Sequence, residues 1–116
     1  PVTWIDVPMP VSYASKKLVE QLRVLEPFGK GNEKPVFADR KLTVRSANMI
    51  GKNKNVLKMQ LEDTQGHVVD AIQFKVEEED MPLRGKEISI VYYPDINEFR
   101  GNQTLQFIVQ EWCYTT

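Results

Sequence analysis

The sequence predicts a mainly β domain, a small closed barrel of five strands with one helix in front of it. Two observations support this class. From residue 36 onward, apolar and polar side chains alternate with a period of two, which is typical of half-buried strands. Short turn signals separate these alternating runs, and no helical pattern stands between one strand and the next. We therefore expect the strands to pair as an antiparallel barrel or sandwich rather than in βαβ units.

One helix is expected near the N-terminus. Residues 1–11 hold three prolines and are expected to form an extended lead-in or linker. Ser12 or Ser15 can cap a helix, because a serine oxygen accepts from free N–H groups of the first turn. Pro27 disfavours helical geometry at the residue before it, so the helix should end near residue 25. Four apolar residues form the predicted helical stripe: Leu18, Val19, Leu22 and Leu25.

The stretch LEPFGKGNEKPVF, residues 25–37, is expected to join the helix to the barrel. Phe28 is predicted to plug the barrel end, while two glycines let the backbone turn there. Pro35 has no N–H for a strand ladder and fits the start of the first strand. A DNA contact from Lys30, Asn32 and Lys34 is a lower-ranked alternative. The predicted structural joint comprises Pro27, Phe28, Gly29, Gly31, Asn32 and Pro35, and the predicted domain divisions are 1–11, 12–28 and 29–116.

The barrel strands follow in order along the chain. The connection between the third and fourth strands, residues 75–85, is acidic and is broken by Pro82 and Gly85, so it can hold a helical turn but not a strand. Five strands with one longer connection at this place are typical of the OB-fold, a Greek-key barrel. An SH3-like barrel stays open as an alternative. The predicted strands are 36–50, 56–63, 67–74, 86–93 and 103–112, with loops at 51–55, 63–66, 75–85 and 94–102.

Composition limits the function classes. The chain has 116 residues, enough for one domain, and it begins at Pro1, which suggests a fragment of a larger protein. One cysteine, Cys113, excludes an intrachain disulfide and agrees with a reducing, cytoplasmic location. No apolar run reaches the roughly 20 residues of a membrane span, so no membrane partner is expected. One histidine, His67, and one cysteine cannot form a zinc site, and no phosphate-binding loop or active site is visible, so we expect no cofactor and no catalysis.

The net charge of −1 hides an uneven distribution. Residues 30–60 carry eight cations against two acids, whereas residues 61–99 carry three cations against ten acids. A basic segment of this kind indicates a polyanionic partner for the first half. The alternative, that these charges only solvate exposed strand faces, is equally open at this point.

A binding surface is predicted from the OB-fold itself. Ligands of this fold cross strands two and three, between the loop that joins strands one and two and the loop that joins strands four and five. Cations there can follow phosphates, and Phe99 can stack on a base unless it folds back onto the barrel end. From the third strand, Asp70 and Gln73 are further candidates. The predicted DNA-binding residues are Arg45, Lys52, Lys54, Asn55, Lys58, Gln60, Asn97, Phe99 and Arg100.

Four motifs resemble a known family. They are LEPFGKGNEKPVF (25–37), MIGKNKNVLKMQL (49–61), VVDAIQF (68–74) and INEFRGNQTLQFIVQEW (96–112). Together they resemble the OB domain of the bacterial RecJ exonucleases, which degrade single-stranded DNA from 5′ to 3′. The resemblance implies a parent enzyme of DNA repair and recombination, whose DHH and DHHA1 domains use Mn or Mg. It also implies that this chain, which lacks an Asp-His-His sequence, helps to hold the single strand and does not cleave it.

Two other functions remain as alternatives. The chain can be a structural module that docks on the catalytic core of the parent or on a single-strand-binding protein, with little DNA contact. The acidic half and the single aromatic near the predicted groove favour this reading. An unrecognised small enzyme is the third hypothesis.

Overall fold

The chain folds as a β-barrel in the computed structural model, which describes residues 3–8 and 35–115, with the side chains of Ala38 and of residues 41–115. The predicted helix over 12–25 lies outside these residues. So do five of the joint residues: Pro27, Phe28, Gly29, Gly31 and Asn32. The elements are β1 (Thr3–Pro8), β2 (Pro35–Ile50), β3 (Val56–Glu62), β4 (Val68–Phe74), the 3₁₀ turn η2 (Glu78–Asp80), β5 (Glu87–Phe99) and β6 (Asn102–Tyr114).

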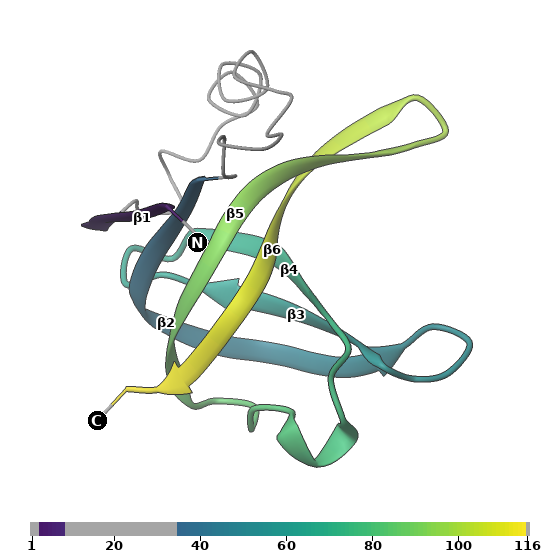
Figure 1. Cartoon of the computed structure of the whole chain (residues 1–116), viewed down its shortest axis with the longest axis horizontal. Coiled ribbons are helices and arrows are strands. Elements are labelled where there is room, and N and C mark those ends of the chain that lie inside the picture. The colour runs from purple at the N-terminus through teal and green to yellow at the C-terminus, as the bar shows by residue number, and fades with distance from the viewer. Residues whose placement is uncertain (1–2, 9–34, 116) are drawn as a thin grey trace.

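Five of the strands close on themselves, as the sequence predicts. The sheet runs in the order β1-β2-β3-β4-β6-β5, and an additional pairing of β2 with β5 closes the barrel (Figure 1). All barrel pairings are antiparallel except β4 with β6, which is a short parallel ladder from Asp70↔Gln106 to Ile72↔Ile108. This arrangement is the Greek-key barrel of an OB-fold.

Strand β2 pairs with two neighbouring strands, one after the other along its length, which explains why it has 16 residues. Its first part pairs with β5 as far as Thr43, and its second part pairs with β3 from Thr43 to Ile50. The strand bends between the two parts through irregularities next to Lys41 and Arg45. A single bent strand therefore turns the sheet into a barrel.

The barrel interior is filled by alternate residues of every strand. In β3, Leu57, Met59 and Leu61 are fully buried while the residues between them face outward. At the centre of the core the rings of Tyr92 and Phe107 stack, with centroids 3.9 Å apart and planes inclined by 18°. This core holds the outer face of β3 and β4 in a defined position.

The predicted loop at 94–102 is wrong. Strands β5 and β6 stay paired as far as Phe99↔Asn102, and only Arg100 and Gly101 form the turn. Their φ angles of 52° and 80° are those of a type I′ hairpin turn, which matches the twist of paired strands. Pro94 is tolerated because it lies beyond Tyr92, where the described pairing of β5 with β2 ends, and a proline fits a strand with one neighbour.

Strand β1 was not predicted as a paired strand. The sequence indicates extended backbone here, and residues Thr3–Pro8 do form a strand that pairs in parallel with the start of β2. Pro35 is the first residue of β2 and the partner of Thr3.

Two shorter predictions are confirmed. Residues 63–66 form a turn in which the N–H of Gly66 donates to the carbonyl of Asp63 at 3.2 Å, and Gly66 has a φ of 89°. Residues 75–85 contain the 3₁₀ turn η2 and no strand. Among the described residues there is no helix with the length and hydropathy needed to cross a membrane.

Candidate nucleic-acid interface

The outer face of β3 and β4 is polar at its centre. Register pairs Lys58 with Ile72 and Gln60 with Asp70, so these four side chains point to the same side, away from the core. The side-chain amide of Gln60 donates to a carboxylate oxygen of Asp70 at 3.5 Å, a long and exposed contact. Lys58 and Gln60 are exposed, as the alternation predicts.

The β2–β3 hairpin carries further cations at one end of this face. Its turn is closed by a hydrogen bond from the N–H of Lys54 to the carbonyl of Gly51 at 3.1 Å, and both residues have positive φ. The carbonyl of Asn55 accepts from the N–H of Val76 at 2.9 Å, which ties the chain after β4 to the hairpin base. Residues 51–55 are all exposed, and within the described part of the chain Lys52 and Lys54 have no acidic partner.

The β5–β6 hairpin presents an aromatic ring and a cation at its tip. Phe99 is 65% exposed, so its side chain does not fold back onto the barrel end. The guanidinium of Arg100 lies over this ring at 5.1 Å from the centroid. Asn97 is exposed on the same strand, and its carbonyl accepts a long hydrogen bond of 3.5 Å from the Thr104 hydroxyl.

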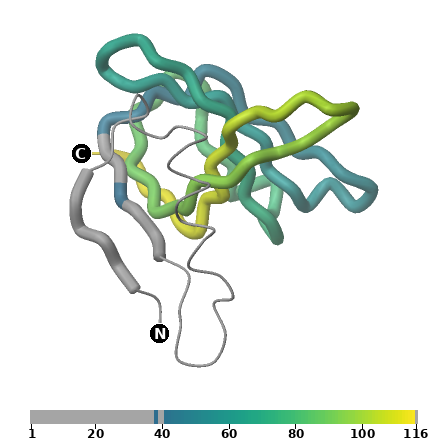
Figure 2. The backbone as a smooth tube through the Cα atoms, turned by 90° about the horizontal axis from the view of Figure 1, so that it is seen from above, coloured from purple at the N-terminus to yellow at the C-terminus, as the bar shows by residue number. Residues whose placement is uncertain are grey.

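The fold brings the two hairpins to one side of the molecule. In two perpendicular views the β2–β3 and β5–β6 hairpins both project in the same direction from the barrel (Figures 1 and 2). We call the surface formed by these hairpins and the outer face of β3–β4 the hairpin face. It includes eight of the nine predicted DNA-binding residues: Lys52, Lys54, Asn55, Lys58, Gln60, Asn97, Phe99 and Arg100.

Arg45 and Gln73 lie elsewhere. The guanidinium of Arg45 is 2.6 Å from the carboxylate of Glu62, at the end of β3 that lies away from the β2–β3 turn. Its charge is therefore compensated within the chain. Gln73 pairs with buried Leu57 and faces the barrel interior, where its amide donates to the carbonyl of Gln110 at 3.3 Å. Gln73, a further candidate from this strand, therefore does not share the outer face with Asp70, because residues three apart on a strand face opposite sides.

Sequence reasoning missed an apolar row at the base of the first hairpin. Ile50 pairs with Val56, and Val56 pairs with Phe74, so the three side chains cross β2, β3 and β4 on the outer face. Phe74 is 57% exposed and Ile50 39% exposed. Phe74 is the second exposed aromatic of the hairpin face. The sequence held a signal for this position, because Phe74 and Asp70 are an even number of residues apart on one strand and therefore share a face.

Cations occupy strained backbone around this face. The four non-glycine residues with positive φ in the described part of the chain are Lys41, Lys54, Lys75 and Arg100. Glycine or asparagine adopts this left-handed conformation at lower cost than a long side chain. Three of the four, Lys54, Lys75 and Arg100, belong to the hairpins or follow Phe74 directly. Strained residues concentrate at functional sites, so their side chains point to a role beyond folding.

The described part of the chain holds no candidate metal cluster. Within residues 3–8 and 35–115 there is no group of three or more His, Cys, Asp or Glu side chains that fits a metal ion. Asp63 and His67 form an isolated pair at 3.0 Å in the β3–β4 turn. Burial raises the pKa of Asp63. Hydrogen bonds from the backbone of His67 and Gln65 and from the His67 ring lower it by a larger amount, so the net pKa lies below its ordinary value.

The chain is similar to several known proteins. It is 36% identical over 110 residues to the "Single-stranded-DNA-specific exonuclease RecJ" of Haemophilus influenzae, covering 93% of this chain and 19% of that protein. The protein of the same description from Salmonella typhimurium is 31% identical, with 91% of this chain and 18% of that protein covered. The crystal structure of RecJ in complex with Mn2+ from Thermus thermophilus matches with a TM-score of 0.72 at 19% identity, over 97% of this chain and 16% of that chain.

This chain therefore spans about a fifth or less of the length of these relatives. The likeness to the Thermus structure confirms the fold. The model of the RecJ OB domain matches residues 5–111, nearly the whole sequence, and the chain accordingly belongs to the RecJ OB domain family.

Proposed function

We propose that this chain binds single-stranded DNA without sequence preference, as the OB domain of a single-strand-specific 5′→3′ exonuclease. The observation that supports this best is the hairpin face, where uncompensated lysines and two exposed phenylalanines lie on one side of the barrel. The relatives carry the description "Single-stranded-DNA-specific exonuclease".

The chemistry of the hairpin face suits a flexible polyanion with flat bases. Lys52, Lys54 and Lys58 can follow phosphates, because no described acid compensates their charge. Phe99 and Phe74 each expose more than half of their surface and can stack on bases, which is worth about 1–3 kcal/mol per base. Stacking does not depend on base identity, so the expected binding is sequence-independent.

The carboxylates limit where the strand can run. Asp70 and Glu62 lie on the same outer face, and a phosphate beside either of them would be repelled. The phosphates should therefore pass along the lysines of the β2–β3 hairpin, while bases face Phe74 and Phe99. This path places the backbone away from the Arg45–Glu62 ion pair.

For the whole protein, we propose hydrolysis of single-stranded DNA in the cytoplasm during repair and recombination. The reaction would be carried out by domains outside this chain, with Mn or Mg as the metal. The role of this chain would be to hold the strand and lead it toward those domains. It would bind no metal and cleave nothing by itself, which a nuclease assay of the chain with Mn can test directly.

The binding proposal is tested by fluorescence anisotropy with a labelled oligothymidylate of about 15 nucleotides. Affinity should fall with salt, and each lost phosphate contact should reduce the slope of log K against log salt by about 0.7. The double variant Lys52→Ala with Lys54→Ala should thus flatten the slope by about 1.4. The matched control, Lys41→Ala with Lys86→Ala, removes two exposed lysines elsewhere and should leave the slope unchanged. Equal slopes in all three proteins would refute the assignment.

A second candidate function is docking on the catalytic domains or on a single-strand-binding protein. The exposed acidic turn at Glu77–Asp80 favours it, since these carboxylates have no partner in the described part of the chain. If docking is the main function, capture of the partner should survive loss of Lys52, Lys54 and Arg100. DNA binding by the chain alone would then be weak and insensitive to these variants.

A further inference from the structure

Strand β2 has an open edge in its second half. Its pairing with β5 ends at Thr43, and Val44 completes the ladder by donating to the carbonyl of Lys86 at 2.9 Å and accepting from Gly85 at 2.7 Å. From Arg45 to Ile50, the only described strand neighbour is β3. Half of the backbone N–H and C=O groups here thus lack a ladder partner among the described residues, which is a template for another strand.

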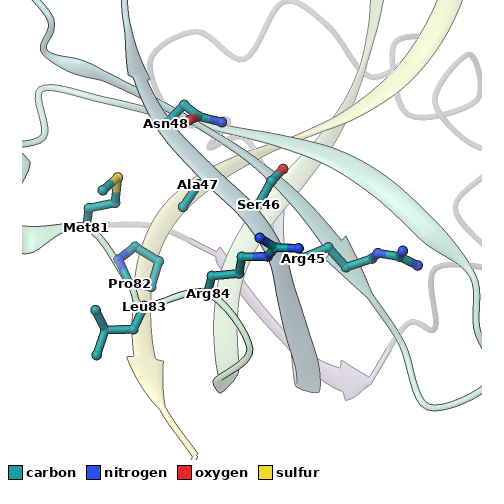
Figure 3. Close-up of a pocket in the computed structure, with 8 residues that line it drawn as sticks. All are labelled: Arg45, Ser46, Ala47, Asn48, Met81, Pro82, Leu83 and Arg84. Carbon is teal, nitrogen blue, oxygen red and sulfur yellow. The ribbon is translucent and has the colours of Figure 1, made fainter.

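A groove runs beside this open edge. Its cavity of about 460 Å³ lies between Arg45–Asn48 of β2 and the segment Met81–Arg84 (Figure 3). Ala47 and Met81 form an apolar floor, since both pack against the hydrophobic core. Leu83 is 62% exposed and stands on the opposite wall. The N–H of Leu83 donates to the Tyr114 hydroxyl at 2.9 Å, which anchors that wall to β6.

The available charge of the groove is positive. Its only charged lining residues are Arg45 and Arg84. Arg45 is engaged with Glu62, whereas Arg84 has no ion pair or hydrogen bond among the described residues. In Figure 3 the Arg84 side chain extends toward β2, away from the side chains of Met81, Pro82 and Leu83. A ligand that brings one carboxylate to Arg84 and one apolar group to the floor would complement both features.

Nucleic acid fits this groove poorly. None of its eight lining residues is aromatic, so bases would have no platform on which to stack. A strand edge offers backbone donors and acceptors in a regular row, which a peptide matches and a phosphodiester chain does not. Alternate side chains of an added strand face the same side, so two residues at positions i and i+2 can both reach the groove.

We propose that the groove between Arg45–Asn48 and Met81–Arg84 binds an extended, acidic and apolar segment of another protein by strand addition. An apolar side chain of the segment rests on Ala47, Met81 and Leu83, and an acidic side chain two positions away pairs with Arg84. The backbone of the segment completes the open edge of β2. This site is separate from the hairpin face and does not depend on DNA binding by the chain.

The test uses the 116-residue chain and a fluorescein-labelled octapeptide with serine at the odd positions and aspartate, leucine, aspartate and leucine in turn at the even positions, so that an acidic and an apolar side chain stand two positions apart on one face. We expect saturable binding by anisotropy, and NMR shifts confined to the amides of Arg45–Asn48, Met81, Leu83 and Arg84. Arg84→Ala should weaken binding about tenfold, as loss of one charge-assisted contact predicts. Lys52→Ala with Lys54→Ala, the matched control on the hairpin face, should leave peptide binding unchanged.

Backbone methylation separates strand addition from mere charge attraction. Two further octapeptides carry N-methyl groups at the odd or at the even positions, and strand addition predicts that one of the two loses binding while the other retains it. Equal binding by both, or binding of a lysine–leucine octapeptide as strong as that of the acidic one, would overturn the proposal. So would an oligothymidylate that shifts the Arg45–Asn48 amides and displaces the peptide. Arg84→Ala should leave the salt dependence of DNA binding unchanged. The peptide-binding proposal can therefore fail while the proposed DNA binding at the hairpin face holds, and the reverse.

Discussion

The guanidinium carbon of Arg100 lies 5.1 Å from the centre of the Phe99 ring at the tip of the β5–β6 hairpin. This contact covers one side of the ring, and 65% of Phe99 remains exposed. The ring is therefore held in place with a free surface directed to solvent. A base that stacks on it gains contact area at little entropic cost, because the aromatic is already ordered.

Phe99→Ala should weaken binding of oligothymidylate by roughly 5- to 150-fold, the loss of about 1–3 kcal/mol of stacking. The melting temperature should change little, since Phe99 is not part of the core. Anisotropy titration and thermal unfolding measure the two quantities. Leu83→Ala removes a comparably exposed side chain outside the hairpin face and should keep full affinity. A loss of the same size in both variants would contradict a stacking role.

Arg100→Gly should raise stability while it lowers DNA affinity. Arg100 has a φ of 52°, and glycine relieves this strain by about 0.5–1 kcal/mol. The same change removes a cation from the hairpin face, so the salt slope of binding should flatten by about 0.7. Lys41→Gly is the control, since Lys41 has a φ of 61° in β2 and lies outside that face. It should gain stability with unchanged affinity, and a fall in affinity equal to that of Arg100→Gly would refute the assignment.

Phe74→Ala should reduce DNA affinity at the other hairpin. Phe74 is 57% exposed and lies in the apolar row with Val56 and Ile50, next to the lysines of the β2–β3 turn. We expect a loss of about 1 kcal/mol or more in binding, with a smaller loss of stability. Phe74→Tyr keeps a flat ring and should retain most of the affinity. If the alanine and tyrosine variants bind alike, the ring does not stack on bases.

The barrel core was predictable because burial imposes a local pattern on each strand. Leu57, Met59 and Leu61 alternate with polar residues, and all three are fully buried. The order and number of the barrel strands follow from such runs and from the turns between them. The length of β5 could not be predicted from the sequence. Pro94 and the polar residues after it favour a loop locally, but pairing with β6 overrides that preference.

The proposed binding surface was predictable in part. The position of Lys58 and Gln60 on the outer face follows from alternation, and the projecting hairpins follow from the fold. The ion pair of Arg45 with Glu62 joins residues 17 apart in sequence and carries no local signal. The pairing of β1 with β2 is likewise non-local, and the open edge of β2 depends on where β5 leaves it.

Phe107→Ala should destabilise the domain by about 3–5 kcal/mol. Phe107 is fully buried and stacks on Tyr92, so its removal leaves a cavity at the centre of the barrel. Urea unfolding followed by tryptophan fluorescence measures the loss. Thr104→Ala, on the same strand but exposed, should unfold within about 0.5 kcal/mol of the parent chain. A cost below about 1 kcal/mol for Phe107→Ala would mean that the core repacks around the gap.

The β3–β4 turn should weaken in acid because of Asp63. One carboxylate oxygen accepts from the N–H groups of Gln65 and His67 at 2.9 and 2.8 Å, and the other lies 3.0 Å from the His67 ring. These bonds hold the net pKa of Asp63 below its ordinary value of 3.8. A carboxyl group with a lowered folded-state pKa stabilises the fold above its unfolded-state pKa, and that contribution disappears as the pH falls through the folded-state pKa.

Asp63→Ala should therefore cost about 1–2 kcal/mol near neutral pH, through loss of two charge-assisted hydrogen bonds. The difference from the parent chain should stay constant from about pH 7 down to about 5 and shrink below about 4, because protonated Asp63 no longer favours the folded state. Urea titrations at several pH values measure both curves. Glu79→Ala removes an exposed carboxylate without a described partner, so its free energy of unfolding should change with pH in the same way as that of the parent chain. If the stability difference for Asp63→Ala stays unchanged down to about pH 3, the ionised carboxylate of Asp63 is not what stabilises this turn.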